Sequence, residues 1–305
     1  MSRSVIAKIV VLVALTTNEH VSLAAPIFVP NHSFESPPTP FVNISIESWQ
    51  KTPKPDWYVE GGGFLWTQLT GAFKNTATNS PDHIKNCDGA QAIWLFAVPE
   101  AGLFQDYDSM DLDDPAPSHA FDAKFEVGKS YHLAVGIIGT GGGMQQGATL
   151  ELSLYFRDAA SNRIAVAAIG VTNLLTVFSN STQLVDCTVN VPTVRSNDAW
   201  AGRNIGIMFL STVTTNLQGG YWDLDNVRLL EGPALLNPVR TNGQLHFTLL
   251  GEVGAAFEIF TTTNAALPVT EWISLETLTN LTGTIPFVDT NGSFDQRFYQ
   301  ARQLP

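Results

Sequence analysis

Carboxylates and aromatic side chains are the residues of this chain best suited to chemistry. The densest charged stretch is residues 106–114, which is rich in aspartate. Its oxygens could bind calcium, but the stretch lacks the glycine and the closing glutamate of a twelve-residue calcium loop. We therefore interpret it as a solvated acidic loop. Paired carboxylates could also hydrolyse a glycosidic bond if they lie ~5–10 Å apart, a distance that a sequence does not give.

The patterns of other catalytic centres are missing from the sequence. The histidines are scattered, without the His-x-x-x-His spacing of a zinc helix, and no Gly-x-Ser-x-Gly nucleophile elbow occurs. The glycines within residues 139–143 lack the following lysine and helix that a phosphate-binding loop requires. We expect no zinc, serine-nucleophile or phosphate chemistry.

Aromatic residues in predicted loops are candidates for ligand binding. Sugar rings have apolar faces, so proteins bind them on aromatic side chains flanked by a few amides or carboxylates. The candidate ligand-binding residues are Trp57, Trp66, Gln105, Tyr107 and Trp200. Core packing is the alternative for each tryptophan, and Gln105 could bond backbone instead of a ligand. Trp94 and Trp222 lie within apolar strands and are expected in the core.

The elements that position these residues are predicted to be strands. In residues 149–156, Leu150, Leu152, Leu154 and Phe156 alternate with other residues, which is the period of a half-buried strand. Only 14% of the residues are charged, and glycine and proline are frequent, which argues against coiled coils and charge-rich disorder. Many short strands separated by turns indicate an all-β fold, an antiparallel β-sandwich or barrel.

A break near residue 235 divides the chain into two predicted domains. Pro233 and Pro238 cannot continue a central strand, because proline has no backbone donor. We predict a large domain over residues 26–231, a linker over 232–241 and a small β-sandwich domain over 242–305.

The first residues have the order of a secretory signal. Arg3 and Lys8 precede the apolar run 9–15, and Ser22-Leu23-Ala24 offers a cleavage site, which predicts a signal peptide over residues 1–24. An uncleaved anchor is the alternative. The apolar run is shorter than the ~20 residues that span a bilayer. We expect an exported protein, secreted or held at the cell surface or in the periplasm, with no membrane span.

Charge and cysteine content limit the partners further. The formal net charge is −12 and no basic run occurs, which excludes a typical nucleic-acid-binding protein. Cys87 and Cys187 are the two cysteines. In an oxidising compartment they could form a disulfide, and two small buried thiols are the alternative.

Five segments in register carry a resemblance to a known family. They are residues 29–35, 88–95, 102–105, 125–133 and 221–229. In this order they resemble the galactose-binding-like jelly rolls of carbohydrate-binding modules and of related plant cell-wall proteins, over residues 28–230. Residues 242–305 look like the small immunoglobulin- or fibronectin-like β-domains of exported bacterial proteins.

The resemblance implies two packed antiparallel sheets and a bound structural calcium ion. It assigns Glu35 and Asp225 as calcium ligands, with Asn31 as a weaker candidate. A change of alternation around Asp225 predicts a β-bulge there, and a carboxylate at such a bulge needs a partner. The alternative is that Glu35 accepts backbone hydrogen bonds and Asp225 faces solvent.

These observations favour a secreted, non-catalytic protein that binds a polysaccharide or glycan. A structural or surface-interaction protein without a sugar ligand is the first alternative. A polysaccharide-active lyase or hydrolase is the second, because the same fold also carries enzymes.

Overall fold

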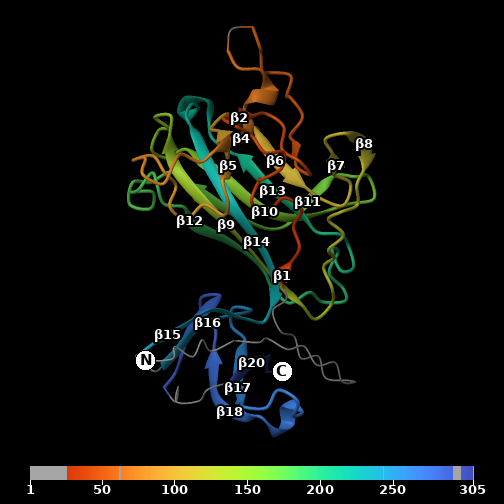
Figure 1. Ribbon diagram of the computed structural model, residues 1–305. Coiled ribbons are helices and arrows are strands. Elements are labelled where there is room, and N and C mark those ends of the chain that lie inside the picture. The colour runs from red at the N-terminus through yellow and green to blue at the C-terminus, as the bar shows by residue number, and fades with distance from the viewer. Residues whose placement is uncertain (1–25, 62, 243, 291–296, 305) are drawn as a thin grey trace. The chain divides into compact units, whose positions relative to one another are not determined.

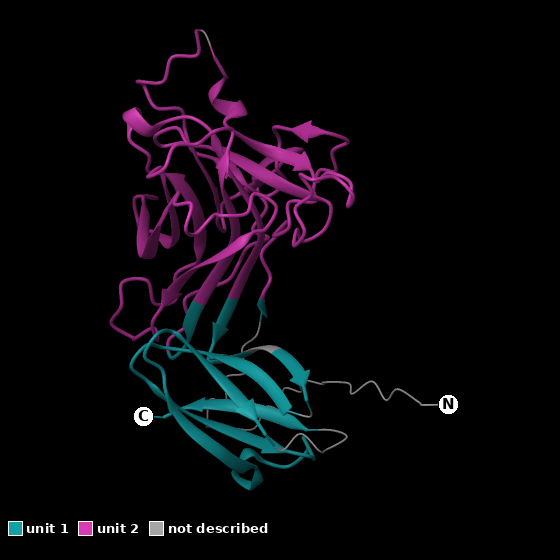
Figure 2. Ribbon diagram, turned by 90° about the vertical axis from the view of Figure 1, so that its left-hand side faces the viewer, with its two compact units in different colours: residues 1–26, 128–131, 230–305 teal, residues 27–127, 132–229 magenta. Residues whose placement is uncertain are grey.

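The computed structural model describes residues 26–61, 63–242, 244–290 and 297–304, so the predicted signal peptide lies outside the described residues. The chain forms two compact units, shown in different colours in Figure 2. The large unit comprises residues 27–127 and 132–229, and the small unit comprises 128–131 and the described residues from 230 onwards, with Pro26. Strands make up nearly all of the regular structure, which confirms the predicted antiparallel β-sandwich class.

Two sheets form the large unit (Figure 1). The first has the order β12-β9-β14-β5-β4-β2, with β1 also paired to β14. Its strands are β1 (Pro26–Ile27), β2 (Val42–Asn43), β4 (Thr70–Lys74), β5 (Gln91–Phe96), β9 (Ser130–Gly141), β12 (Val185–Val191) and β14 (Tyr221–Gly232). The second has the order β11-β10-β13-β6-β3. Its strands are β3 (Gln50–Lys51), β6 (Gly102–Gln105), β10 (Thr149–Arg157), β11 (Arg163–Thr172) and β13 (Gly206–Ser211).

Short elements connect these strands. The 3-10 helices η1 (Trp66–Gln68) and η2 (Thr215–Leu217) precede β4 and β14. A small hairpin, β7 (Met110–Asp111) and β8 (Asp114–Pro117), occupies the predicted acidic loop.

Alternation along the strands builds the core of the large unit. Leu150, Leu152 and Leu154 of β10 are fully buried, as the period-2 pattern predicts. However, Ser153 and Tyr155 on the other face are buried as well, so the strand is not half-buried. On β14, Trp222 and Leu224 are fully buried in the same way. Asn226, just after the predicted bulge, has a φ of 56°, in the left-handed region, where the alternation changes.

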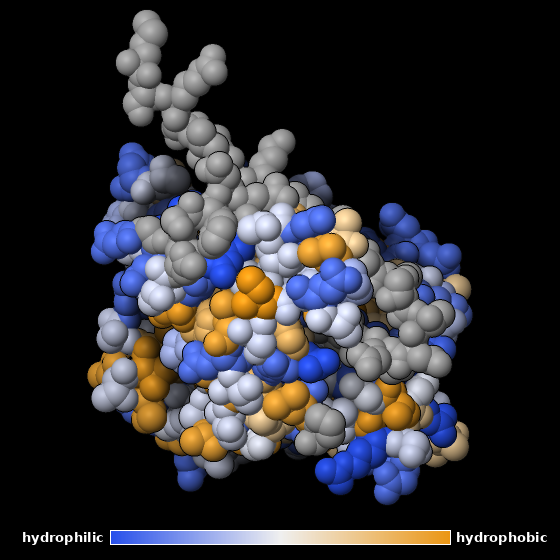
Figure 3. All heavy atoms as spheres, turned by 90° about the horizontal axis from the view of Figure 1, so that it is seen from below, coloured by the Kyte–Doolittle hydropathy of each residue, from blue (hydrophilic) through white to orange (hydrophobic). Residues whose placement is uncertain are grey.

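The small unit contains two three-stranded sheets, β15-β16-β19 and β18-β17-β20. Their strands are β15 (Ala234–Thr241), β16 (Gln244–Leu250), β17 (Ala256–Thr262), β18 (Ile273–Thr279), β19 (Thr284–Asp289) and β20 (Phe298–Gln303), with η3 (Val269–Glu271) before β18. Phe247, Leu249, Phe257 and Ile259 form the centre of the core. On the face shown in Figure 3, apolar side chains lie in small groups separated by polar ones.

Strand β15 lies where the sequence predicts a linker. It is an edge strand, and its register against β16 shifts between Leu236 and Val239, on either side of Pro238. A proline is tolerated there because an edge strand with a bulge does not need every backbone donor. No helix among the described residues is long and apolar enough to cross a membrane.

Candidate functional site

The structure places two predicted ligand-binding residues in the interior. Trp66 is only 5% exposed, and its indole nitrogen donates to the Thr52 carbonyl oxygen at 2.7 Å. Gln105 is buried as well, and its amide donates to the carbonyl oxygens of Pro30 and Ser48. Trp66 therefore packs in the core and Gln105 bonds to backbone, which are the alternatives given for these residues in the sequence analysis.

The other three predicted ligand-binding residues do not form one platform. Trp57 is 44% exposed and its indole nitrogen donates to a carboxylate oxygen of Glu100 at 2.9 Å. Tyr107 stacks on His119 with ring centroids 4.0 Å apart. The indole N–H of Trp200 is buried without a hydrogen-bond partner among the described residues. Within the part of the chain that the structure describes, no ring contact joins these three side chains.

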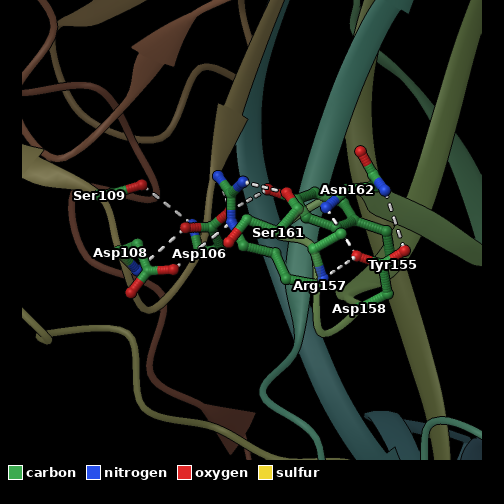
Figure 4. Close-up of polar contacts among 9 residues, drawn as sticks. Asp106, Asp108, Ser109, Tyr155, Arg157, Asp158, Ser161 and Asn162 are labelled. Atoms are coloured by element: carbon green, nitrogen blue, oxygen red, sulfur yellow. Dashed lines mark hydrogen bonds and ion pairs between the residues drawn. The ribbon is translucent and has the colours of Figure 1, made fainter.

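The predicted acidic loop contains a buried ionic network (Figure 4). Asp106 is 4% exposed, and its Oδ2 accepts hydrogen bonds from the Tyr155 hydroxyl at 2.5 Å and from Arg157 Nε at 2.9 Å. The Arg157 guanidinium also donates to the Ser161 carbonyl oxygen. Burial, with the charge of Asp106, raises the pKa of Tyr155. The first aspartate of the loop is thus a structural anchor, whereas Asp108 remains half-exposed.

The predicted calcium ligands Glu35 and Asp225 bind the same short segment. Glu35 Oε1 accepts from the backbone N–H groups of Ala90 and Gln91, and Asp225 Oδ2 accepts from that of Asp88. Asp225 is fully buried, contrary to the solvent-facing alternative, and burial raises its pKa to about 7. Its Oδ1 has no hydrogen-bond partner among the described residues.

Asn31, the weaker predicted ligand, has a different role. Its amide donates to the carbonyl oxygens of Ser36 and Glu47, and its Oδ1 accepts from the Ser36 backbone N–H. These bonds hold the loop that follows it. A search of the described residues finds no group of three or more His, Cys, Asp or Glu side chains arranged to hold a metal ion.

The predicted disulfide is not present, because Cys87 and Cys187 are both free. Burial raises the pKa of Cys187 to about 11, and burial together with Asp225 raises that of Cys87. Both thiols are therefore protonated at neutral pH and are poor nucleophiles.

A thiol titration tests this correction. Ellman's reagent should find two thiols per chain in denaturant without reductant, and should react much more slowly with the folded protein. A count of fewer than two thiols in denaturant would instead support the predicted disulfide.

One titratable residue that the sequence analysis missed is Asp223. It lies between the buried Trp222 and Leu224 on β14, so alternation directs its side chain to the opposite face of the sheet. Burial raises its pKa to about 7, and its Oδ1 has no hydrogen-bond partner among the described residues. Asp223 is consequently largely uncharged just below neutral pH. The sequence signal was an aspartate flanked by two core residues.

Aromatic side chains surround Asp223 on this face. Its partner across the sheet is Trp94, and its strand neighbour Tyr221 pairs with Phe96, with ring centroids 5.9 Å apart. The ring of Phe64 lies beside that of Phe96, with centroids 4.9 Å apart. The charge of Asp223 contributes to the raised pKa of Tyr221, after burial. The surface thus combines a protonated acid with π-faces, which suits an apolar aromatic compound.

Gly71 makes room for the indole of Trp94. A Cβ at position 71 would lie 2.3 Å from Trp94 Cη2, which is far closer than any real contact. The indole nitrogen donates to the Gln68 carbonyl oxygen at 3.0 Å. The ring is therefore fixed over β4, with Gly71 and Gln68 setting its position.

Comparisons with known proteins point to catalysis. The family model "HpiC1-like: HpiC1 cyclase" matches residues 25–230. A solved cyclase from Fischerella sp. TAU matches with 23% identity and a TM-score of 0.50, over 69% of this chain and 98% of that one. A second cyclase from the same organism was solved with (3Z)-3-(1-methyl-2-pyrrolidinylidene)-3H-indole. It matches with 23% identity and a TM-score of 0.49, over 69% of this chain and 99% of that one.

Carbohydrate-binding domains match the fold more weakly. The xylan-binding domain CBM22-1 from Paenibacillus barcinonensis Xyn10C has 13% identity and a TM-score of 0.30, over 60% of this chain and 85% of that one. A comparison with curated proteins finds no match.

The expected non-catalytic function and polysaccharide partner are therefore wrong. The family model that matches two thirds of the chain describes a cyclase and not a carbohydrate-binding protein. The jelly-roll resemblance describes the architecture only. With the cyclase model matching two thirds of its length, the chain belongs to the HpiC1-like cyclase family.

Proposed function

We propose that the large unit is an acid catalyst that protonates an electron-rich aromatic compound and thereby starts its cyclisation. The observation that carries the proposal is Asp223, a half-buried carboxyl whose pKa is raised to about 7 by burial, beside aromatic side chains. A general acid works best when its pKa lies near the working pH, because a large fraction is then protonated and the acid is still strong enough to transfer its proton.

The surroundings of Asp223 support each part of this reaction. Protonation of an aromatic ring produces a cation, and the π-faces of Trp94, Phe96 and Tyr221 stabilise a cation by electrostatic attraction. Once it has lost its proton, the Asp223 carboxylate is a base that can remove a proton at the end of the cyclisation. Family membership provides the reaction class, and the aromatic surface provides the class of substrate.

Hydrogen exchange in an indole tests the proposal without knowledge of the natural substrate. Indole is the first probe, because its ring is electron-rich and protonates at C3. In D₂O at pH 6.5, the protein should accelerate deuterium incorporation at C3 by at least about tenfold over buffer, measured by proton NMR.

Two variants provide the control for this experiment. Asp223→Asn should remove the acceleration, and Asp82→Asn, at an exposed position, should retain it. Equal exchange rates for the wild type and for Asp223→Asn would contradict the proposed role of Asp223.

The donors around Asp225 fit a calcium ion in several respects. A buried carboxylate oxygen without a partner is costly, and calcium prefers carboxylate and carbonyl oxygens. Glu35 brings a second carboxylate to the segment that Asp225 binds. We propose that Glu35 and Asp225 would hold calcium, which would supply positive charge that offsets the buried carboxylate of Asp225 and the half-buried one of Glu35. The ion would join the N-terminal segment to β14.

Calcium should stabilise the protein in a pH-dependent way. A ligand at a hundred times its dissociation constant contributes about 2.7 kcal/mol, or roughly 5–10 °C in Tm for a domain of this size. Because burial raises the pKa of Asp225 to about 7, the carboxylate forms only above that pH. The calcium-induced rise in Tm should therefore be larger at pH 8 than at pH 6.

Magnesium is the control, because it demands a smaller, octahedral site. Asp225→Asn should abolish the calcium response. A Tm that calcium leaves unchanged at pH 8 would remove calcium from the proposal.

Export through residues 1–24 is also a proposal, based on the sequence order of charged, apolar and small residues. Mass spectrometry of the mature N-terminus tests it, and an intact Met1 would contradict it.

A further inference from the structure

An open cavity in the large unit has a lining that includes neither Asp223 nor the aromatic side chains beside it. Its volume is about 470 Å³, and its lining comes from β3, from the residues just before β4 and from the β7–β8 hairpin. The Gln50 amide donates to the Met110 carbonyl oxygen at 3.0 Å, and the Leu112 backbone N–H donates to Glu47. These bonds fix the hairpin against β3 and so hold the walls in place.

Lys51 lines this cavity and has an unusual environment for a lysine. Its Nζ donates to the carbonyl oxygens of Thr67 and Thr70, the latter at 2.7 Å. In the described part of the chain no carboxylate lies within ion-pair distance of Nζ, although Asp111, Asp113 and Asp114 also line the cavity. The amino group of a lysine is normally exposed to solvent or paired with a carboxylate. Lys51 has two neutral acceptors instead.

Two acceptors satisfy both donors of a neutral amine and leave one N–H of an ammonium ion to solvent. An ammonium group has three N–H donors, whereas an amine has two donors and one lone pair. With both amine donors used by Thr67 and Thr70, the lone pair is left over as a nucleophile. Burial lowers the pKa of Lys51 from its ordinary value of 10.5 to about 8, so the unprotonated fraction near neutral pH is far larger than that of an ordinary lysine.

We propose that Lys51 is the nucleophile of a second small-molecule site, where it condenses with an uncharged aldehyde or ketone to form an imine. The proposal uses neither Asp223 nor the proposed cyclisation, although η1 accepts hydrogen bonds from both Lys51 and Trp94.

The lining of the cavity defines the class of ligand. The three hairpin aspartates repel anions, so the carbonyl compound should carry no negative charge. Ile44, Met110 and Leu112 are exposed apolar side chains in the lining and offer contact to an apolar body. An uncharged carbonyl compound with an apolar group meets these conditions.

The atoms balance without a further reactant. The lone pair of Nζ attacks the carbonyl carbon, and the C=O π electrons move to oxygen, giving a carbinolamine after proton transfer from nitrogen to oxygen. The C–O bond then breaks as the nitrogen forms the C=N bond. Both amine protons leave with the oxygen as water. A protonated imine would retain one N–H, which can donate to Thr67 or Thr70.

Reductive labelling of the intact protein tests the proposal. Benzaldehyde with cyanoborohydride converts an imine to a stable benzyl-lysine, which peptide mass mapping locates. At pH 7.5, Lys51 should be labelled at least about tenfold faster than Lys54, which lies three residues away with an exposed side chain paired to Glu60. The rate at Lys51 should level off above about pH 8, and benzyl alcohol should slow it by occupying the cavity.

Each outcome decides the proposal. Faster labelling at Lys51 with protection by benzyl alcohol supports it, and Lys51→Arg, which keeps the donors but not the nucleophile, should remove that label. Labelling of Lys51 no faster than that of Lys54, or fast labelling that benzyl alcohol does not slow, would overturn it.

Discussion

Replacing Asp223 by asparagine should lower the turnover of a cyclisation substrate by about 10²–10⁴-fold while leaving the fold intact. Asparagine keeps the shape of the side chain but has no proton to give, and loss of a general acid costs that order of magnitude. In the wild type, activity should fall as pH rises through about 7, because burial has raised the pKa of Asp223 to that value and ionisation removes the acid.

The same variant should be more stable than the wild type above neutral pH. An aspartate has a pKa near 3.9 in an unfolded chain and about 7 in this fold, so the folded state holds the extra proton between these values. The contribution of Asp223 to stability is therefore present below pH 4 and lost as pH rises to 7. Asparagine avoids this loss, worth about 1–3 kcal/mol at pH 8 after allowance for partial exposure.

Activity and stability should thus move in opposite directions, which a general structural defect does not produce. Thermal melts at pH 5 and pH 8, beside the pH profile of turnover, measure both. A variant that loses activity together with stability at pH 8 would show that Asp223 only supports the fold.

Asp106→Ala should destabilise the large unit by about 3–5 kcal/mol. The substitution removes the acceptor of the Tyr155 hydroxyl and of Arg157, and leaves a partly buried guanidinium with only the half-exposed Asp108 as its charge partner. Urea unfolding at pH 7 measures the change. Tyr155 also packs closely on Gly206, where a Cβ would lie 2.3 Å from Cζ.

Asp108→Ala is the matched control in the same loop. Its carboxylate is half-exposed and 3.6 Å from Arg157 Nε, so its loss should cost less than about 1 kcal/mol. Equal effects of the two substitutions would mean that the burial of Asp106 does not contribute to stability.

Strand periodicity predicted the fold class because it reports local burial directly. The alternation of Leu150, Leu152 and Leu154 is sufficient to place β10 in a sandwich. Periodicity did not predict that the segment around Pro238 forms strand β15 rather than a linker. A strand can contain a proline when it lies at the edge of a sheet, as β15 does. Edge position depends on pairing, which one segment does not encode.

The site was harder to predict than the fold. Glycines before Trp66 indicated exposure, yet η1 turns the indole inward to the Thr52 carbonyl oxygen. Asp223 was overlooked because its chemistry depends on its protonation, and protonation depends on desolvation by strands distant in sequence. The segment pattern that resembles carbohydrate-binding modules describes a shared scaffold, on which binding and catalysis are equally possible.

The contact between Gly71 and Trp94 has an evolutionary consequence. Since no side chain fits beneath the indole, the two positions cannot change independently. Among related chains, a larger residue at position 71 should occur only with a smaller one at 94, and such pairs would mark chains in which the aromatic surface beside Asp223 has a different shape.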